Sequence, residues 1–103
     1  MDSTQRLERD IQASLIKQYE AQGYIVVKLI LTNLTGIPDL LLLKDGKASF
    51  VEVKRPGQKP RPLQEYRIKQ LQQFGFEVRV EDGQEQMKQL SHAHARKSTT
   101  RRQ

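Results

Sequence analysis

Residues 36–54 read G-I-P-D-L-L-L-L-K-D-G-K-A-S-F-V-E-V-K, and this stretch decides the fold. Asp45-Gly46, at its centre, is the strongest short signal for a two-residue β-hairpin turn. The apolar segments on either side predict two antiparallel strands, over 40–43 and 48–53. Leu40 to Leu43 lacks the alternation of a half-exposed strand, so we expect helices to cover both faces of the sheet.

Three charged residues interrupt this apolar hairpin, which is costly unless they are paired or bound to a metal. A two-residue turn pairs Lys44 with Lys47, and the same register places Asp39 opposite Glu52. Opposed Cβ atoms lie about 5 Å apart and like charges there repel, so we expect a cation between the two carboxylates. Lys54 follows Glu52 by two positions and projects from the same face. A three-residue loop or a bulge would break this register.

The two carboxylates suggest a hydrolytic metal site. Oxygen donors with no Cys or His nearby favour a hard cation, Mg²⁺ or Mn²⁺. Such an ion can activate water and neutralise charge on a phosphodiester, so the pattern predicts cleavage of a nucleic-acid backbone. Lys54 would hold the attacking water or offset charge in the transition state. The alternative is a surface hairpin with Glu52 and Lys54 solvated and Asp39 merely ending a loop.

A first helix is predicted over 4–22, ended by Gly23, because apolar residues recur every four positions: Leu7, Ile11, Leu15 and Tyr19. Glu8 falls on this apolar stripe. It would supply a third carboxylate if it faces the charged side of the hairpin. Alternatively, it reaches solvent at the start of the helix.

A second helix is predicted over 62–74, with Pro62 in its first turn and an apolar stripe that includes Leu63, Tyr66, Leu71 and Phe74. Gln64 lies within this stripe. It would bind a water or a phosphate near the metal, or it would cap the helix as a partly exposed amide.

The remaining pattern predicts an α/β fold. Strands are expected over 24–32 and 76–80, the last one parallel to 48–53 through a right-handed helical crossover. The result is a small mixed sheet, an antiparallel hairpin plus one parallel strand, with helices on both faces. We expect a single domain over 1–91, with a short helix over 84–90, and a basic, disordered tail over 92–103.

The charge balance favours polyanionic partners. The chain has 18 Lys and Arg against 12 Asp and Glu, a net charge of +6. Four tail residues carry positive charges, so removing them leaves +2 for the rest: Arg96, Lys97, Arg101 and Arg102. Aromatic residues make up only 6%, which leaves no evident stacking platform for single strands. Phosphate contacts are expected from a basic loop and the helix after it: Arg55, Lys59, Arg61 and Lys69.

Two segments carry a family resemblance, G-I-P-D at 36–39 and V-E-V-K at 51–54, which resemble the P-D-(D/E)-x-K nuclease signature. The continuation P-G-Q-K-P-R-P-L-Q at 56–64 is similar to the virus-type replication-repair nuclease (VRR-NUC) domain. The resemblance covers roughly 7–80 and implies a restriction-endonuclease-like core. It implies that Asp39, Glu52 and the main-chain carbonyl of Val53 bind the metal and that Lys54 is the catalytic lysine. Glu8 would correspond to the acidic residue of the family's first helix, and Gln64 to its helical glutamine.

The resemblance also implies a substrate. Stand-alone relatives are viral or bacterial, act on DNA in the manner of Holliday-junction resolvases, and work as homodimers. Two symmetric cuts need two matched sites, which a twofold dimer provides. Tyr24 and Ile25 are candidate interface residues if the first strand forms a sheet edge. The open alternatives are a flap or restriction-type nuclease with the same core, and a non-catalytic nucleic-acid-binding module that is indifferent to Glu52→Gln.

Several classes are excluded or disfavoured by composition. The chain has no cysteine, which rules out disulfides and thiolate zinc sites. No run reaches the ~18 apolar residues of a membrane span, and the N-terminus lacks a secretory pattern. We therefore expect an intracellular protein, in a bacterial host or encoded by a virus or prophage, with a role in DNA repair. No membrane partner or small-molecule cofactor is expected, and His92 and His94 are interpreted as solvated.

Overall fold

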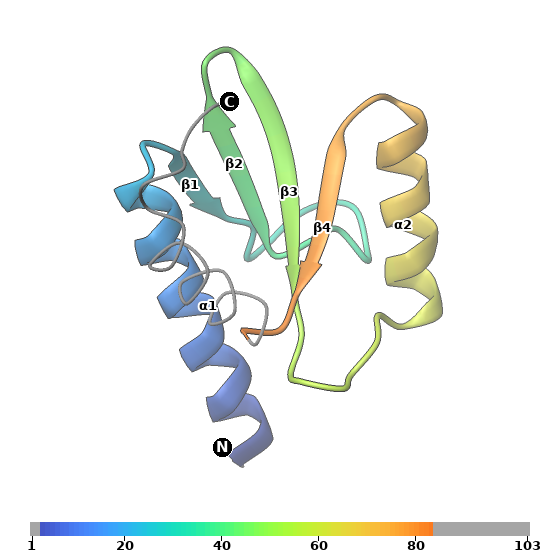
Figure 1. Ribbon diagram of the computed structural model, residues 1–103. Helices are drawn as coiled ribbons and strands as arrows, with labels where there is room; N and C mark the ends of the chain where they lie inside the picture. Colours follow the sequence, from blue (N-terminus) through green and yellow to red (C-terminus); the bar gives the residue numbers. More distant parts are fainter. Residues whose placement is uncertain (1–2, 84–103) are drawn as a thin grey trace, which may run out of the picture.

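The computed structural model describes residues 3–83, with side chains described from Leu7 onward (Figure 1). The predicted helix over 84–90 and the predicted tail over 92–103 lie outside this part. The described chain forms two helices and a four-stranded mixed sheet, in the order α1 (Ser3–Ala21), β1 (Ile25–Lys28), β2 (Leu40–Lys44), β3 (Lys47–Val53), α2 (Pro62–Gln73) and β4 (Glu77–Glu81). This arrangement confirms the predicted fold class. Neither described helix combines the length and apolar composition that a membrane crossing requires.

The β2–β3 hairpin has the predicted turn and register. Asp45-Gly46 adopts positive φ at both residues, 54° and 75°, which is the backbone of a type I′ turn. Lys44 pairs with Lys47, and the ladder continues to the residue after Asp39. Extending the same register by one pair puts Asp39 opposite Glu52. The turn chemistry thus sets which charged residues face each other at the far end of the hairpin.

The outer strands flank this hairpin in the sheet order β1-β2-β3-β4. β4 pairs parallel to β3 through the α2 crossover, as predicted, and its Val80 pairs with Glu52. β1 is shorter than the predicted strand over 24–32, because its ladder with β2 ends where Leu40 pairs with Lys28. One further bond, from the Leu29 N–H to the Asp39 carbonyl at 2.8 Å, joins the segments before the chain turns away.

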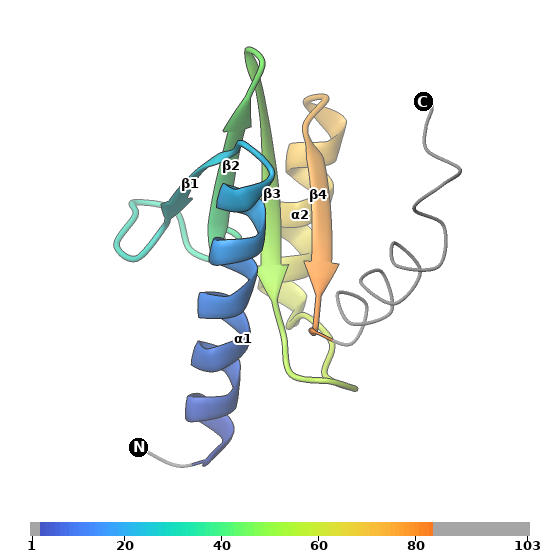
Figure 2. The ribbon, with the colours of Figure 1, turned by 60° about the vertical axis from the view of Figure 1, so that its left-hand side comes forward.

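The main hydrophobic core lies between α1 and one face of the sheet (Figure 2). Its buried members come from α1, β2 and β3: Leu15, Tyr19, Leu40, Leu42, Val51 and Val53. Leu7, at the other end of the α1 stripe, is 45% exposed because the N-terminal half of the helix extends beyond the sheet (Figure 1). This overhang carries Glu8 past the ends of the strands.

The second helix lies on the second face of the sheet, as predicted, but it covers that face only in part, so helices do not enclose the leucine run on both sides (Figure 2). α2 packs near β4, and neither described helix covers β1 and β2 on that face (Figure 2). Leu41 and Leu43 are consequently only half-buried, while Leu40 and Leu42 are fully buried.

The prediction that the apolar stripe of α2 faces the core is also wrong. Leu63, Tyr66 and Phe74 are 46%, 58% and 76% exposed, and the buried residue of the helix is Ile68. Because α2 lies at the edge of the sheet, only a narrow row of its side chains reaches the strands.

Candidate active site

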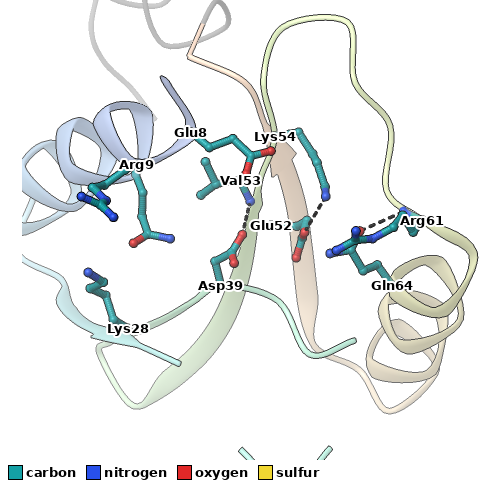
Figure 3. A pocket seen from close by; sticks show the side chains of 10 residues that line it. Glu8, Arg9, Lys28, Asp39, Glu52, Val53, Lys54, Arg61 and Gln64 are labelled. Carbon is teal, nitrogen blue, oxygen red and sulfur yellow. Dashed lines mark hydrogen bonds and ion pairs between the residues drawn. The ribbon is translucent and has the colours of Figure 1, made fainter. Parts of the chain in front are cut away.

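A polar cavity of about 320 Å³ opens at the C-terminal end of β3. Four elements meet there: the overhanging half of α1, the end of β1, the segment leading into β2, and the start of α2. The lining side chains are shown in Figure 3: Glu8, Arg9, Gln12, Lys28, Asp39, Glu52, Val53, Lys54, Arg61 and Gln64. Six of the predicted site residues thus share one cavity, together with one predicted phosphate contact, Arg61.

Glu52 is the most enclosed carboxylate of this cavity, at 1% exposure. Its Oε2 lies 3.5 Å from Nζ of Lys54, which is also buried. Its Oε1 is buried and has no hydrogen-bond partner in the described part of the chain. Burial and the nearby Asp39 carboxylate raise the pKa of Glu52 to about 7, against the opposing effect of Lys54. One oxygen of a buried acid therefore lacks a donor or cation.

Asp39 is positioned by the hairpin itself. Its Oδ2 accepts a hydrogen bond from the Val53 N–H at 2.8 Å, which fixes the carboxylate across the end of β3 (Figure 3). Burial raises the pKa of Asp39, while this hydrogen bond and the Lys54 ammonium oppose the rise and Glu8 adds to it. Since Oδ2 is held by the main chain, Oδ1 is the oxygen left to face a ligand.

Glu8 lines the cavity but does not complete a three-carboxylate cluster. Within residues 7–83, no three acidic or histidine side chains are gathered closely enough to hold one metal ion. With the amide of Gln58 oriented to satisfy both of its groups, its nitrogen donates to Glu8 Oε2 at 2.9 Å and its oxygen accepts from Arg55 Nη2 at 3.0 Å. The basic loop therefore holds Glu8 at the wall of the cavity, beside the pair formed by Asp39 and Glu52.

Gln64 both caps α2 and lines the cavity, which are the two alternatives considered for it from the sequence. Its Oε1 accepts a hydrogen bond from the Arg61 N–H at 2.8 Å, which caps the first turn of α2. It also lines the cavity opposite Glu52 (Figure 3). Because the oxygen is used in the cap, the amide nitrogen is the group available to the cavity.

The other predicted phosphate contacts lie outside this cavity. Arg55 and Lys59 belong to the loop before α2, and Lys69 is on the exposed side of that helix. Arg9, Gln12 and Lys28 line the cavity without having been predicted. Gln12 follows Glu8 by one helical turn, so the helical period could have found it. Lys28 could not be identified as a cavity residue, because it fell in the middle of the predicted strand over 24–32 rather than at its end.

The donor set fits a divalent cation. Asp39 and Glu52 present hard oxygen donors from opposed strands, the main chain of Val53 adjoins them, and the donor-free Oε1 of Glu52 is a buried acceptor in need of a cation. Removing two acidic groups from water raises their pKa values, and a bound cation reverses this effect by favouring the charged forms. The site has the charge and the ligand type for Mg²⁺ or Mn²⁺.

Comparison with known proteins agrees with the nuclease signature. Residues 3–85 match the VRR-NUC domain family. A relative named "Putative nuclease p44", from Acyrthosiphon pisum secondary endosymbiont phage 1, is 37% identical over 79 residues, 76% of this chain and 85% of that protein. A solved VRR_NUC domain structure superposes with a TM-score of 0.72 at 33% identity, covering 84% of this chain and 95% of that one. The chain therefore belongs to the VRR-NUC family of nuclease domains.

Proposed function

We propose that the chain is a divalent-metal-dependent endonuclease that hydrolyses phosphodiester bonds in branched DNA, with the four-way junction as its preferred substrate. The observation that carries the proposal is the buried, donor-free Oε1 of Glu52 beside Asp39 and Lys54. A buried carboxylate oxygen without a partner is destabilising by about 1–3 kcal/mol, and more when charged. A bound ligand that contacts this oxygen explains why the protein keeps such an unfavourable group better than a contribution to folding stability does.

The carboxylates of Asp39 and Glu52 would hold the cation, with the main-chain carbonyl of Val53 as a further ligand. When bound, the cation lowers the pKa of water and neutralises charge on the phosphate. Lys54, held 3.5 Å from Glu52, is placed to orient the attacking water or to offset charge on the phosphate oxygens. Glu8 and Gln64 reach the same cavity, where Glu8 would bind waters of the cation and Gln64 would bind a water or a phosphate.

Cations at the rim of the cavity suit the flanking phosphates. Lys28, Arg9 and Arg61 line it from β1, α1 and the start of α2. Phosphate contacts fix the position of DNA without reading its bases, which suits an enzyme that recognises shape. Arg55 and Lys59 would extend this contact along the basic loop.

The proposed enzyme is a homodimer that joins through β1 and the segment after it. β1 is an edge strand, and four apolar side chains are exposed there: Ile25 (65%), Val27 (37%), Ile30 (81%) and Leu31 (93%). Large exposed apolar patches mark interaction surfaces. Analytical ultracentrifugation should give a dimer for wild type and a monomer for Ile25→Glu. Gln72→Glu, a charge added on α2, should remain dimeric.

The central experiment incubates a labelled four-way junction, a flap and a plain duplex with Mg²⁺, Mn²⁺ or chelator. Wild type should cut the junction fastest and only with metal. Lys54→Ala should lose at least about 100-fold in rate, whereas Lys47→Ala, an exposed lysine at the hairpin turn, should cut like wild type. Equal cleavage by Lys54→Ala removes the assigned chemistry. Metal-independent DNA binding without any cleavage indicates a non-catalytic binding module instead.

A further inference from the structure

The exposed side of α2 carries a groove that the catalytic cavity does not use. Its volume is about 300 Å³, and its walls are two aromatic rings with polar side chains between them: Tyr66, Lys69, Gln70, Gln73 and Phe74. We refer to this surface as the α2 groove. Tyr66 and Phe74 are 58% and 76% exposed, so most of the area of each side chain faces solvent.

The Tyr66 ring is held from within the protein. The Arg67 guanidinium lies over it, 5.5 Å from the ring centroid. Arg67 is itself anchored, since its Nε donates to the Thr35 carbonyl at 3.1 Å and its Nη1 donates to Gln70 Oε1 at 2.7 Å. One side of the ring is thus backed by a fixed cation, which leaves the other side for a flat ligand.

The position of the groove relates it to the cavity. α2 begins at the cavity, where Arg61 and Gln64 line the wall, and runs away from it toward the hairpin end of the sheet (Figure 1). At 1.5 Å per residue, Tyr66 and Phe74 lie about 3 Å and 15 Å beyond Gln64 along the helix axis. Stacked bases repeat at roughly 3.4 Å, so the two rings lie at the positions of about the first and the fourth nucleotide from the cavity.

The chemistry of the groove favours nucleic acid over a second copy of the chain. Lys69 and Arg67 outnumber the one acid within α2, Glu65, which precedes Lys69 by one helical turn, so this helix carries a net positive charge. Lysine is depleted in protein interfaces, whereas cations between exposed aromatic rings are typical of single-strand binding surfaces. The patch on β1 and the segment after it, in contrast, exposes four large apolar side chains and suits a protein partner.

We propose that the α2 groove binds unpaired nucleotides next to the cleavage position, with bases stacked on Tyr66 and Phe74 and Lys69 contacting phosphate. The inference rests on the proposed function, because it requires DNA to occupy the neighbouring cavity. On this proposal, the α2 groove recognises the unpaired nucleotides that are exposed where strands separate at a branch point. It differs from the expectation, drawn from the 6% aromatic content, that the chain has no evident stacking platform, and the experiment below decides between the two.

The test measures binding in chelator by fluorescence anisotropy, so that cleavage does not interfere. The probes are a fully paired duplex and the same duplex with a three-nucleotide single-stranded gap. Stacking contributes about 1–3 kcal/mol per base, so Tyr66→Ala/Phe74→Ala should weaken binding to the gapped probe about tenfold or more and to the paired probe less than twofold. Tyr66→Phe, which keeps the ring, and Gln72→Ala, which changes an exposed residue elsewhere on α2, should bind like wild type.

The other outcomes overturn the inference. If the double variant binds both probes like wild type, or loses affinity equally for both, the groove has no stacking role. If the double variant sediments differently from wild type, the groove is a protein interface. Cleavage of the junction by wild type with Mg²⁺, measured in parallel, reports on the proposed function alone. If wild type binds the gap selectively through the groove but does not cut, the nucleotide-binding role of the groove stands, whereas the nuclease proposal and the placement next to a cleavage position fail.

Discussion

Nζ of Lys54 lies 3.5 Å from Oε2 of Glu52, and the other oxygen of the same carboxylate has no donor in the described chain. The pair is therefore only half-satisfied. A buried acid with one ammonium partner and one open oxygen is poorly built for stability, because the desolvation cost of burying an ion pair is repaid only when the remaining hydrogen bonds are made.

Glu52→Gln should separate stability from activity. The amide removes a buried acid, so the metal-free variant should melt at a higher temperature than wild type at pH 8. The same change removes a cation ligand, so millimolar Mg²⁺ or Mn²⁺ should raise the melting temperature of wild type and not that of the variant. Cleavage should fall about 100-fold or more.

Asp45→Asn is the control for charge. It neutralises an exposed acid in a turn that Asn also accommodates, and it should keep both the metal-induced shift and the activity. A metal-induced shift that persists in Glu52→Gln would place the cation elsewhere.

The pKa of Glu52 predicts a pH dependence of stability in the metal-free protein. An unfolded glutamate titrates near 4.5, and burial raises the pKa of Glu52 to about 7 in the folded chain. Between these values the folded state binds more protons, so stability is fully present below about pH 4.5 and is lost as the pH rises through 7. Asp39, whose pKa burial also raises, acts in the same direction.

Urea denaturation in chelator from pH 4.5 to 8 measures this effect. The difference in unfolding free energy between Glu52→Gln and wild type should grow in favour of the variant across this range. The comparison cancels titrations that the two proteins share. A difference that stays constant with pH would mean that Glu52 titrates normally in the folded chain.

The hairpin was predictable because its geometry is local. Asp45-Gly46 determines the turn, the turn determines the register, and the register places Asp39 opposite Glu52. Nothing outside the stretch is needed for this chain of inference. The same reasoning found Lys54, because side chains two apart on a strand share a face.

The surroundings of the pair were less predictable because they depend on tertiary placement. Helical periodicity identified the apolar stripe of α2, but Leu63 and Phe74 face solvent since the helix packs at the sheet edge. Glu8 was expected to add a third carboxylate to the site. Its contact with Gln58, a loop residue 50 positions away, has no signature in the spacing of either segment.

Gly36 is predicted to be the least replaceable glycine near the site. Its φ is +82°, and an added Cβ would lie 2.8 Å from the main-chain carbonyl oxygen of Leu63 at the start of α2. Positive φ costs a non-glycine residue about 1–2 kcal/mol, and overpacking adds about 1–3 kcal/mol. Gly36→Ala should therefore unfold more easily and should also weaken cleavage, because it moves α2 and Gln64 relative to Asp39.

Gly46→Ala is the matched control for backbone strain. Its φ is +75° and nothing lies within 4 Å of an added Cβ. It should be destabilised by the φ cost alone, and the excess for Gly36→Ala in urea denaturation measures the clash with Leu63. Equal losses in the two variants would show that α2 moves freely away from the loop.

Tyr19 links α1 to β4 through a buried acid. Its hydroxyl donates to the carboxylate of Glu81 and accepts from Nη1 of Arg79 at 3.1 Å. Burial, reinforced by Glu81, raises the pKa of Tyr19, so the hydroxyl keeps its proton and remains a donor. Tyr19→Phe should cost about 1–3 kcal/mol, since it removes a donor to a buried carboxylate.

Tyr24→Phe is the control for Tyr19→Phe, since Tyr24 packs edge-on against Tyr19 through its ring, which phenylalanine retains. It should cost less than 0.5 kcal/mol, the range of substitutions away from such networks. The network also reaches the site, because the Lys54 N–H donates to the Glu81 carbonyl at 2.9 Å. Hydrogen exchange should therefore quicken at the Lys54 amide in Tyr19→Phe and not in Tyr24→Phe. Equal exchange in the two variants would mean that the Glu81 side chain does not help to hold the end of β3.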